Sequence, residues 1–124
     1  MAALEIAGRK AELILDLNSW ETIEEEVGRL DEIDSLMESR QRLKNIRKIA
    51  GILSAEGARL GRGEEMPADW LLDNCPPKMA IKVSGAIRLA IVEGMKMETA
   101  ATVEGEQVVD AAMAEIEKKE TPDA

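Results

Sequence analysis

The feature that most restricts the fold of this chain is its near-lack of aromatic side chains. Among its 124 residues there is no Phe and no Tyr, and Trp20 and Trp70 are the only aromatic residues. The core must therefore be built from Leu, Ile, Val, Met and Ala, which suit helix packing better than a β-sandwich. A chain of this length is expected to form one domain with one modest core.

The N-terminal residues predict a β-hairpin. In residues 4–17, LEIAGRKAELILDL, apolar and polar side chains alternate, so that three leucines of the second half would share one face of a strand. Gly8-Arg9 is expected to form the hairpin turn. A lone two-stranded hairpin is marginal in water, so it must pack on helices or pair with another subunit.

A short helix is predicted directly after this strand. Asn18 is a suitable N-cap, and Glu21 three residues later completes a capping-box pattern. Gly28 is expected to end the helix. The apolar face of this helix consists of Trp20, Ile23 and Val27.

Four more segments carry apolar residues at helical spacing. They are residues 30–38, residues 40–57, a short stretch that begins at Pro67, and residues 79–92. Gly57 and Gly94 are expected to end the second and the last of them. The predicted fold class is therefore mainly α: a small helical domain of about five helices with a short N-terminal β-hairpin or strand.

Residues 79–92 form the longest apolar stripe. Its members are Met79, Ala80, Val83, Ala86, Ile87, Ala90 and Ile91, and Ile81, Leu89 and Val92 widen it. A helix that is apolar over so much of its circumference usually packs on two sides. The segment is predicted either to be the central helix or to dock another molecule on one face.

Composition limits the classes of function. The net charge of −9 argues against nonspecific nucleic-acid binding and against an anionic membrane surface. The absence of histidine removes the commonest general base and the favoured zinc ligand. The single cysteine, Cys75, cannot form an intrachain disulfide and is expected to be a structural thiol in a reduced, cytoplasmic setting. No catalytic, cofactor-binding or metal-binding residue is predicted.

Two charged runs leave more than one interpretation open. The acids in residues 24–34 could bind a cation, but their spacing does not match a calcium loop, and a solvated helix face is favoured. The basic run in residues 40–48 could be solvated or could bind nucleic acid. It could also meet the acidic residues 20–34 of the same or a neighbouring chain.

These parts, in this order, resemble the tail assembly chaperones of long-tailed bacteriophages and related gene-transfer particles. The matching segments are LDLNSWETIEEEVG, LKNIRKIAGILSAEG, a Gly-rich loop, MPADWLLDNCPPKM and an apolar helix that ends in AIVEGM. The similarity spans about residues 4–97. Residues 1–97 are therefore expected to form a helical chaperone domain, and residues 98–124 a C-terminal tail that is partly helical or disordered.

The resemblance implies a non-enzymatic role during tail morphogenesis in the host cytoplasm. Such chaperones coat the tape measure protein, bring tail tube subunits to it and are absent from the finished particle. They are also expected to self-associate as homo-oligomers. Many of these phages make a longer form by a programmed frameshift, and Lys118-Lys119 could be encoded by a slippery run.

Six residues are predicted to form protein interfaces: Trp20, Ile23, Val83, Ile87, Ala90 and Ile91. For Trp20 and Trp70 a place in the core is favoured over a role as an interface hot spot. The alternative to a tail chaperone is a small acidic helical adaptor or regulatory protein that acts by protein–protein binding.

Overall fold

The computed structural model describes the backbone of residues 1–100 and the side chains through residue 96. The Lys118-Lys119 pair and most of the predicted tail over residues 98–124 lie outside the described residues. The chain divides into two units, Met1–Gly94 and Met95–Ala124. Of the second unit, the structure describes only the helical continuation through Ala100.

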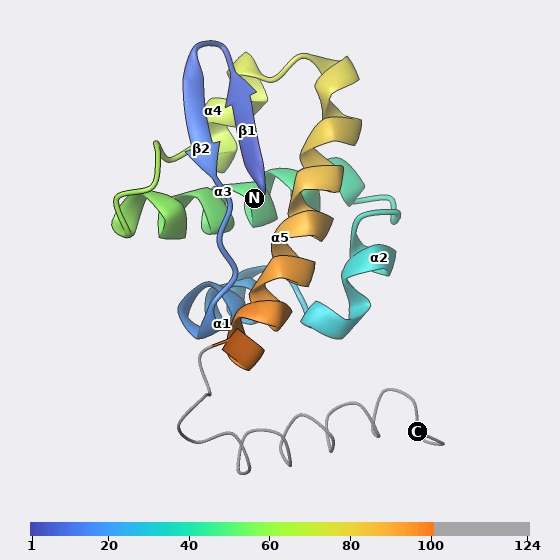
Figure 1. Cartoon of the computed structure of the whole chain (residues 1–124). Helices are drawn as coiled ribbons and strands as arrows, with labels where there is room; N and C mark the ends of the chain where they lie inside the picture. Colours follow the sequence, from blue (N-terminus) through green and yellow to red (C-terminus); the bar gives the residue numbers. More distant parts are fainter. Residues whose placement is uncertain (101–124) are drawn as a thin grey trace. The chain divides into compact units, whose positions relative to one another are not determined.

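The described residues are mainly α-helical with an N-terminal antiparallel hairpin, which confirms the predicted fold class (Figure 1). The elements are β1 (Ala3–Ile6), β2 (Arg9–Glu12), α1 (Leu17–Glu26), the 3-10 turn η1 (Leu30–Glu32), α2 (Ile33–Leu36), α3 (Arg42–Arg59), α4 (Ala68–Asn74), the 3-10 turn η2 (Pro77–Met79) and α5 (Ala80–Ala100).

The hairpin turns one residue earlier than expected. Ala7 and Gly8 both have positive φ angles, 49° and 83°, as the two central residues of a type I′ turn require. The register then pairs Ile6 with Arg9 and Ala3 with Glu12. Glycine tolerates this backbone conformation, which explains why the hairpin itself was predictable although its turn residues were not.

The expected alternation ends after Glu12, where the chain leaves the hairpin. Leu13, Ile14 and Leu15 are all buried. The Ile14 amide donates to the Leu53 carbonyl of α3 (3.2 Å), and Leu15 lies against Gly94 of α5. An extended segment with helices on two sides buries successive side chains, so the prediction of one exposed face was wrong here.

The first helix begins with a different cap from the one predicted. Asp16, not Asn18, is the N-cap, and its side chain accepts a hydrogen bond from the Ser19 amide (3.0 Å). The Ser19 hydroxyl in turn accepts from the Asp16 amide (3.0 Å). The helix ends at Glu26, beside Gly28, as expected.

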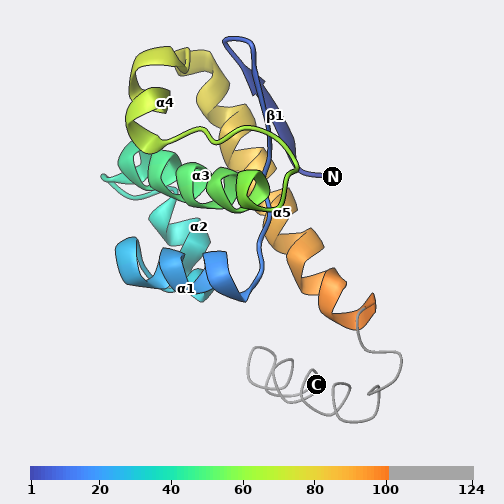
Figure 2. The same ribbon diagram turned by 90° about the vertical axis from the view of Figure 1, so that its left-hand side faces the viewer.

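Helix α3 lies at the centre of the fold. It packs against α1, α4 and β2, and Figures 1 and 2 show α1 and α4 on opposite sides of it. Its buried apolar residues are Ile46, Ile49, Ala50 and Leu53. Among the described elements it is α3, rather than the predicted segment 79–92, that makes most of the close helix contacts.

Two glycines expected to end helices instead lie inside them. Helix α3 continues past Gly57 to Arg59, and α5 continues past Gly94. A Cβ at Gly57 would lie 2.0 Å from the Glu12 carbonyl oxygen, and one at Gly94 would lie 2.6 Å from the Leu15 carbonyl oxygen. At both positions the absence of a side chain therefore allows the extended N-terminal segment to lie close to a helix.

Candidate functional site

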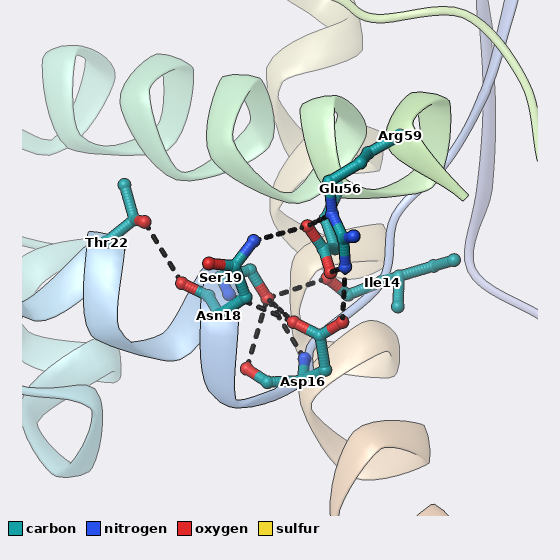
Figure 3. Close-up of polar contacts among 7 residues, drawn as sticks. All are labelled: Ile14, Asp16, Asn18, Ser19, Thr22, Glu56 and Arg59. Atoms are coloured by element: carbon teal, nitrogen blue, oxygen red, sulfur yellow. Dashed lines mark hydrogen bonds and ion pairs between the residues drawn. The ribbon is translucent and has the colours of Figure 1, made fainter. Parts of the chain in front are cut away.

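The most extensive polar cluster joins the start of α1 to the end of α3. It comprises Asp16, Asn18, Ser19, Glu56 and Arg59, and we call it the polar junction (Figure 3). Glu56 is only 3% exposed. Its carboxylate accepts hydrogen bonds from Asn18 Nδ2 (2.8 Å), Arg59 Nε (2.9 Å) and Arg59 Nη2 (2.6 Å). Such charge-assisted bonds are among the stronger ones in proteins.

The pKa values of the two carboxyl groups in the polar junction are shifted in opposite directions. Hydrogen bonds from the Arg59 guanidinium lower the pKa of Glu56 to about 2. Burial, together with the neighbouring Glu56, raises the pKa of Asp16 above its ordinary value. General acids need a raised pKa and a free proton path, whereas Glu56 is held ionised and fully hydrogen-bonded. The arrangement fits a role in fastening α1 to α3.

The cap at Asp16 can be tested directly. We expect Asp16→Ala to lower the free energy of unfolding by about 1 kcal/mol, because the Ser19 amide loses its acceptor. Asp16→Asn is the matched control, since its side-chain oxygen can still accept that bond. Urea unfolding followed by circular dichroism measures both variants. Equal losses in the two would show that the charge of Asp16, and not its cap, stabilises the fold.

One residue in the acidic run of α1, Glu24, has a structural role. Glu24 accepts hydrogen bonds from Trp20 Nε1 (2.9 Å) and from the Leu30 amide (3.1 Å), and these bonds lower its pKa. Glu25 and Glu26 are exposed. Within the part of the chain that the structure describes, no group of three or more acidic, Cys or His residues is placed to hold a metal ion.

The residues predicted to form interfaces are mostly buried within the chain. Ile23, Val83, Ile87 and Ala90 are at most 2% exposed, whereas Trp20 and Ile91 are half-buried. Their role toward a partner stays a prediction. Among residues 80–96 of α5, the large apolar side chains that are exposed are instead Ile81 (82%), Leu89 (43%) and Val92 (48%).

A concave apolar surface lies between α3, α4 and the start of α5. We call it the apolar groove, and its volume is about 340 Å³. Its lining residues are Leu43, Ile46, Arg47, Leu71, Leu72, Cys75, Pro76, Pro77, Ala80 and Val83. Val83 is the one predicted interface residue at this site. Leu43 and Leu72 are 58% and 63% exposed.

The single cysteine is part of this groove. Cys75 is half-buried, and burial raises the pKa of its thiol. A thiol with a raised pKa is a poorer nucleophile near neutral pH, because the thiolate is the reactive form. The expected role of Cys75 as a structural thiol stays a prediction.

The basic run at the start of α3 forms no ion pair with any described carboxylate. Arg47 donates to the Ala68 carbonyl of α4 (3.1 Å), and Arg40, Arg42 and Lys44 are exposed. The ion pairs found among the described residues involve other cations. Pairing of this run with the acids of residues 20–34 in the same chain is therefore not seen, and the other interpretations remain open.

The fold and these surfaces define a small helical domain with an N-terminal hairpin and an apolar groove. Comparison with protein-family models, with curated proteins and with solved structures finds no match. None of the described helices is long and apolar enough to cross a lipid bilayer.

Proposed function

We propose that this chain is a tail assembly chaperone of a long-tailed bacteriophage or gene-transfer particle. It binds the tape measure protein and recruits tail tube subunits in the host cytoplasm, self-associates, and does no catalysis. The proposal is motivated by the resemblance of residues 4–97 to that family. The structural observation that supports it best is the apolar groove, with exposed apolar side chains on α3 and α4 at its walls and another on α5.

Three of these side chains are unusually exposed for their size: Leu43, Leu72 and Ile81, at 58%, 63% and 82%. Burying each in an interface would contribute about 1–2 kcal/mol from apolar area alone. Leu43 and Leu72 line the same groove, and exposed apolar residues that share a surface are typical of protein-binding sites. A chaperone that coats a largely helical partner needs such a surface.

Co-expression tests this function. The tagged full-length chain is produced together with the tail tube and tape measure proteins encoded beside its gene, and we expect both to be retained. Leu72→Asp should reduce retention about tenfold, since a charge would enter an apolar contact. Leu72 suits the test because it is exposed, whereas aspartate at the buried Ile87 would disrupt the fold itself.

The matched control is Leu17→Asp. Leu17 is 76% exposed on α1 and does not line the apolar groove, so its replacement should leave retention unchanged. If the wild-type chain retains neither tail protein, the proposed function is wrong. In that case the acidic adaptor becomes the better interpretation, particularly where the neighbouring genes encode no tube or tape measure protein.

A further inference from the structure

We propose that the apolar groove binds an amphipathic α-helix whose apolar side chains enter the groove and whose acidic side chains face the start of α3. This inference deepens the proposed function by giving the chemistry of the partner segment, and it can fail independently of that function. It rests on the shape of the groove, on the hydrogen-bonded backbone of its helical walls, and on a group of positive charges at the start of α3, of which Arg47 lines the groove.

The shape of the groove suits a helix with a short row of apolar side chains. Its volume of about 340 Å³ lies within the ~300–1,000 Å³ typical of pockets that bind a ligand. Leu43 on the α3 wall and Leu72 on the α4 wall stand exposed, while Val83 at the α5 side is buried. A helix docked between the two leucines would bury both with anchors spaced at i, i+3 or i+4, and i+7.

The backbone around the groove favours a helix over an added strand. Strand addition needs a row of free amide and carbonyl groups, as at the edge of a sheet. The walls here are α3, α4 and α5, whose interior backbone groups bond within each helix. Side chains therefore carry the recognition at this surface, and the partner must satisfy its own backbone, as a helix does.

Charge distinguishes the two long walls. The start of α3 carries five positive residues in nine positions with no acid among them: Arg40, Arg42, Lys44, Arg47 and Lys48. None forms an ion pair with a described carboxylate, although the whole chain has a net charge of −9. Arg47 lines the groove, Arg42 and Lys44 flank its lining residue Leu43, and α4 contributes only the apolar Leu71 and Leu72. An amphipathic helix with its acids toward α3 matches this polarity.

The position of these charges within α3 adds to the argument. The first turn of α3 contains no acidic residue and has no side-chain cap. Positive charge near a helix N-terminus opposes the helix dipole, by about 0.3–1 kcal/mol per charge. Arg42 and Lys44, which lie in this first turn, are thus locally unfavourable for the isolated chain, whereas an acidic partner would interact favourably with both side chains and with the helix terminus. Exposed ion pairs set orientation and specificity more than affinity.

Cys75 supplies a direct readout, because it lines the groove and is the only cysteine of the chain. The probes are two synthetic helical peptides with identical leucines at i, i+3 or i+4, and i+7, flanked either by glutamates or by lysines. We expect the glutamate peptide, at saturation, to slow alkylation of Cys75 in the full-length protein by about tenfold or more. The lysine peptide at the same concentration should not, and added salt should weaken the glutamate peptide.

Variants of the protein test whether the peptide binds in the groove. Leu72→Asp should abolish the protection of Cys75, and the double variant Arg42→Glu, Lys44→Glu should weaken binding of the glutamate peptide by about tenfold. The double variant should still fold, because it removes charges that oppose the dipole of α3. Controls are Leu17→Asp on α1 and Lys96→Glu on α5, which should bind as the wild type does. Circular dichroism and thermal unfolding verify the fold of each variant.

Several results would overturn the inference: equal protection by both peptides, protection by neither, or unchanged binding in a folded Leu72→Asp variant. Protection of Cys75 by a DNA duplex would also overturn it, in favour of nucleic-acid binding by the basic run. Retention of the tail proteins without peptide binding would leave the proposed function standing and remove the groove assignment. Peptide binding without retention of the tail proteins would support the groove assignment and overturn the proposed function.

Discussion

Replacing Gly57 by alanine is expected to lower the free energy of unfolding by about 3 kcal/mol, the upper part of the range for overpacking. The added Cβ would lie 2.0 Å from the Glu12 carbonyl oxygen and 3.1 Å from the Glu12 carbonyl carbon. Both obstructing atoms are backbone, so no side-chain rotation can relieve the overlap. Either β2 must move away from α3 or the helix must bend, and both disturb the centre of the fold.

Gly85→Ala is the matched control for this substitution. Gly85 also lies inside a helix, but no atom lies within 4 Å of the position that its Cβ would take. Alanine is favoured over glycine in a helix by about 0.8–1.0 kcal/mol, so this variant should be slightly more stable than the wild type. Urea denaturation followed by circular dichroism compares the two. If Gly57→Ala were as stable as Gly85→Ala, the close packing of β2 on α3 would be wrong.

Glu56→Gln is expected to lower the free energy of unfolding by about 2 kcal/mol near neutral pH. The amide keeps nearly the same shape and can still accept from Asn18, but it loses the negative charge that holds two nitrogens of Arg59. The loss stays below that of a fully buried ion pair, because the Arg59 side chain is 57% exposed and can regain water.

The pH dependence of this loss gives a sharper test. The pKa of Glu56 falls from an ordinary 4.5 to about 2 in the folded chain, so its contribution to stability is present above about pH 4.5 and is lost as the pH falls toward 2. The pKa of Asp16 is raised, so its contribution has the opposite sign: it is present below its ordinary 3.8 and is lost as the pH rises through the folded value. The two contributions partly cancel in acid.

The difference in stability between wild type and Glu56→Gln should therefore shrink from about 2 kcal/mol near neutral pH to a small fraction of that near pH 2, where the wild-type carboxyl is about half protonated. In the Asp16→Asn variant the opposing contribution of Asp16 is gone. The free energy of unfolding of this variant, which retains Glu56, should therefore fall more steeply with decreasing pH than that of the wild type. Urea unfolding over a series of pH values measures both. A difference independent of pH would contradict the assigned ionisation of Glu56.

Local sequence signals located most of the secondary structure correctly. The helical spacing of apolar residues in residues 40–57 predicted α3, and the spacing in residues 79–92 predicted α5. The hairpin followed from Gly8 between two short apolar runs. These features depend on neighbours a few residues away along the chain, through backbone hydrogen bonds, capping residues and glycine or proline geometry. They can therefore be read without knowledge of the tertiary contacts.

Other features depended on contacts between distant segments. Gly57 and Gly94 look like helix ends in the sequence, but each is a site where the extended residues 12–15 pass close to a helix. The spacing that contains Leu43 and Leu72 does not reveal that both stay exposed, because their burial depends on where a second helix lies. The apolar groove could not be predicted for the same reason, as its walls come from three helices.

The sequence by itself determined that this chain is a mainly helical, aromatic-poor and strongly acidic domain with a basic run in residues 40–48. Those properties are sums over the residues or patterns within a single element. Only the tertiary structure decided that Arg47 of the basic run lines an apolar groove, and that Glu56 accepts hydrogen bonds from Arg59 and Asn18. Both depend on which surfaces are in contact in the folded chain, because those contacts determine which side chains are buried and how their pKa values shift.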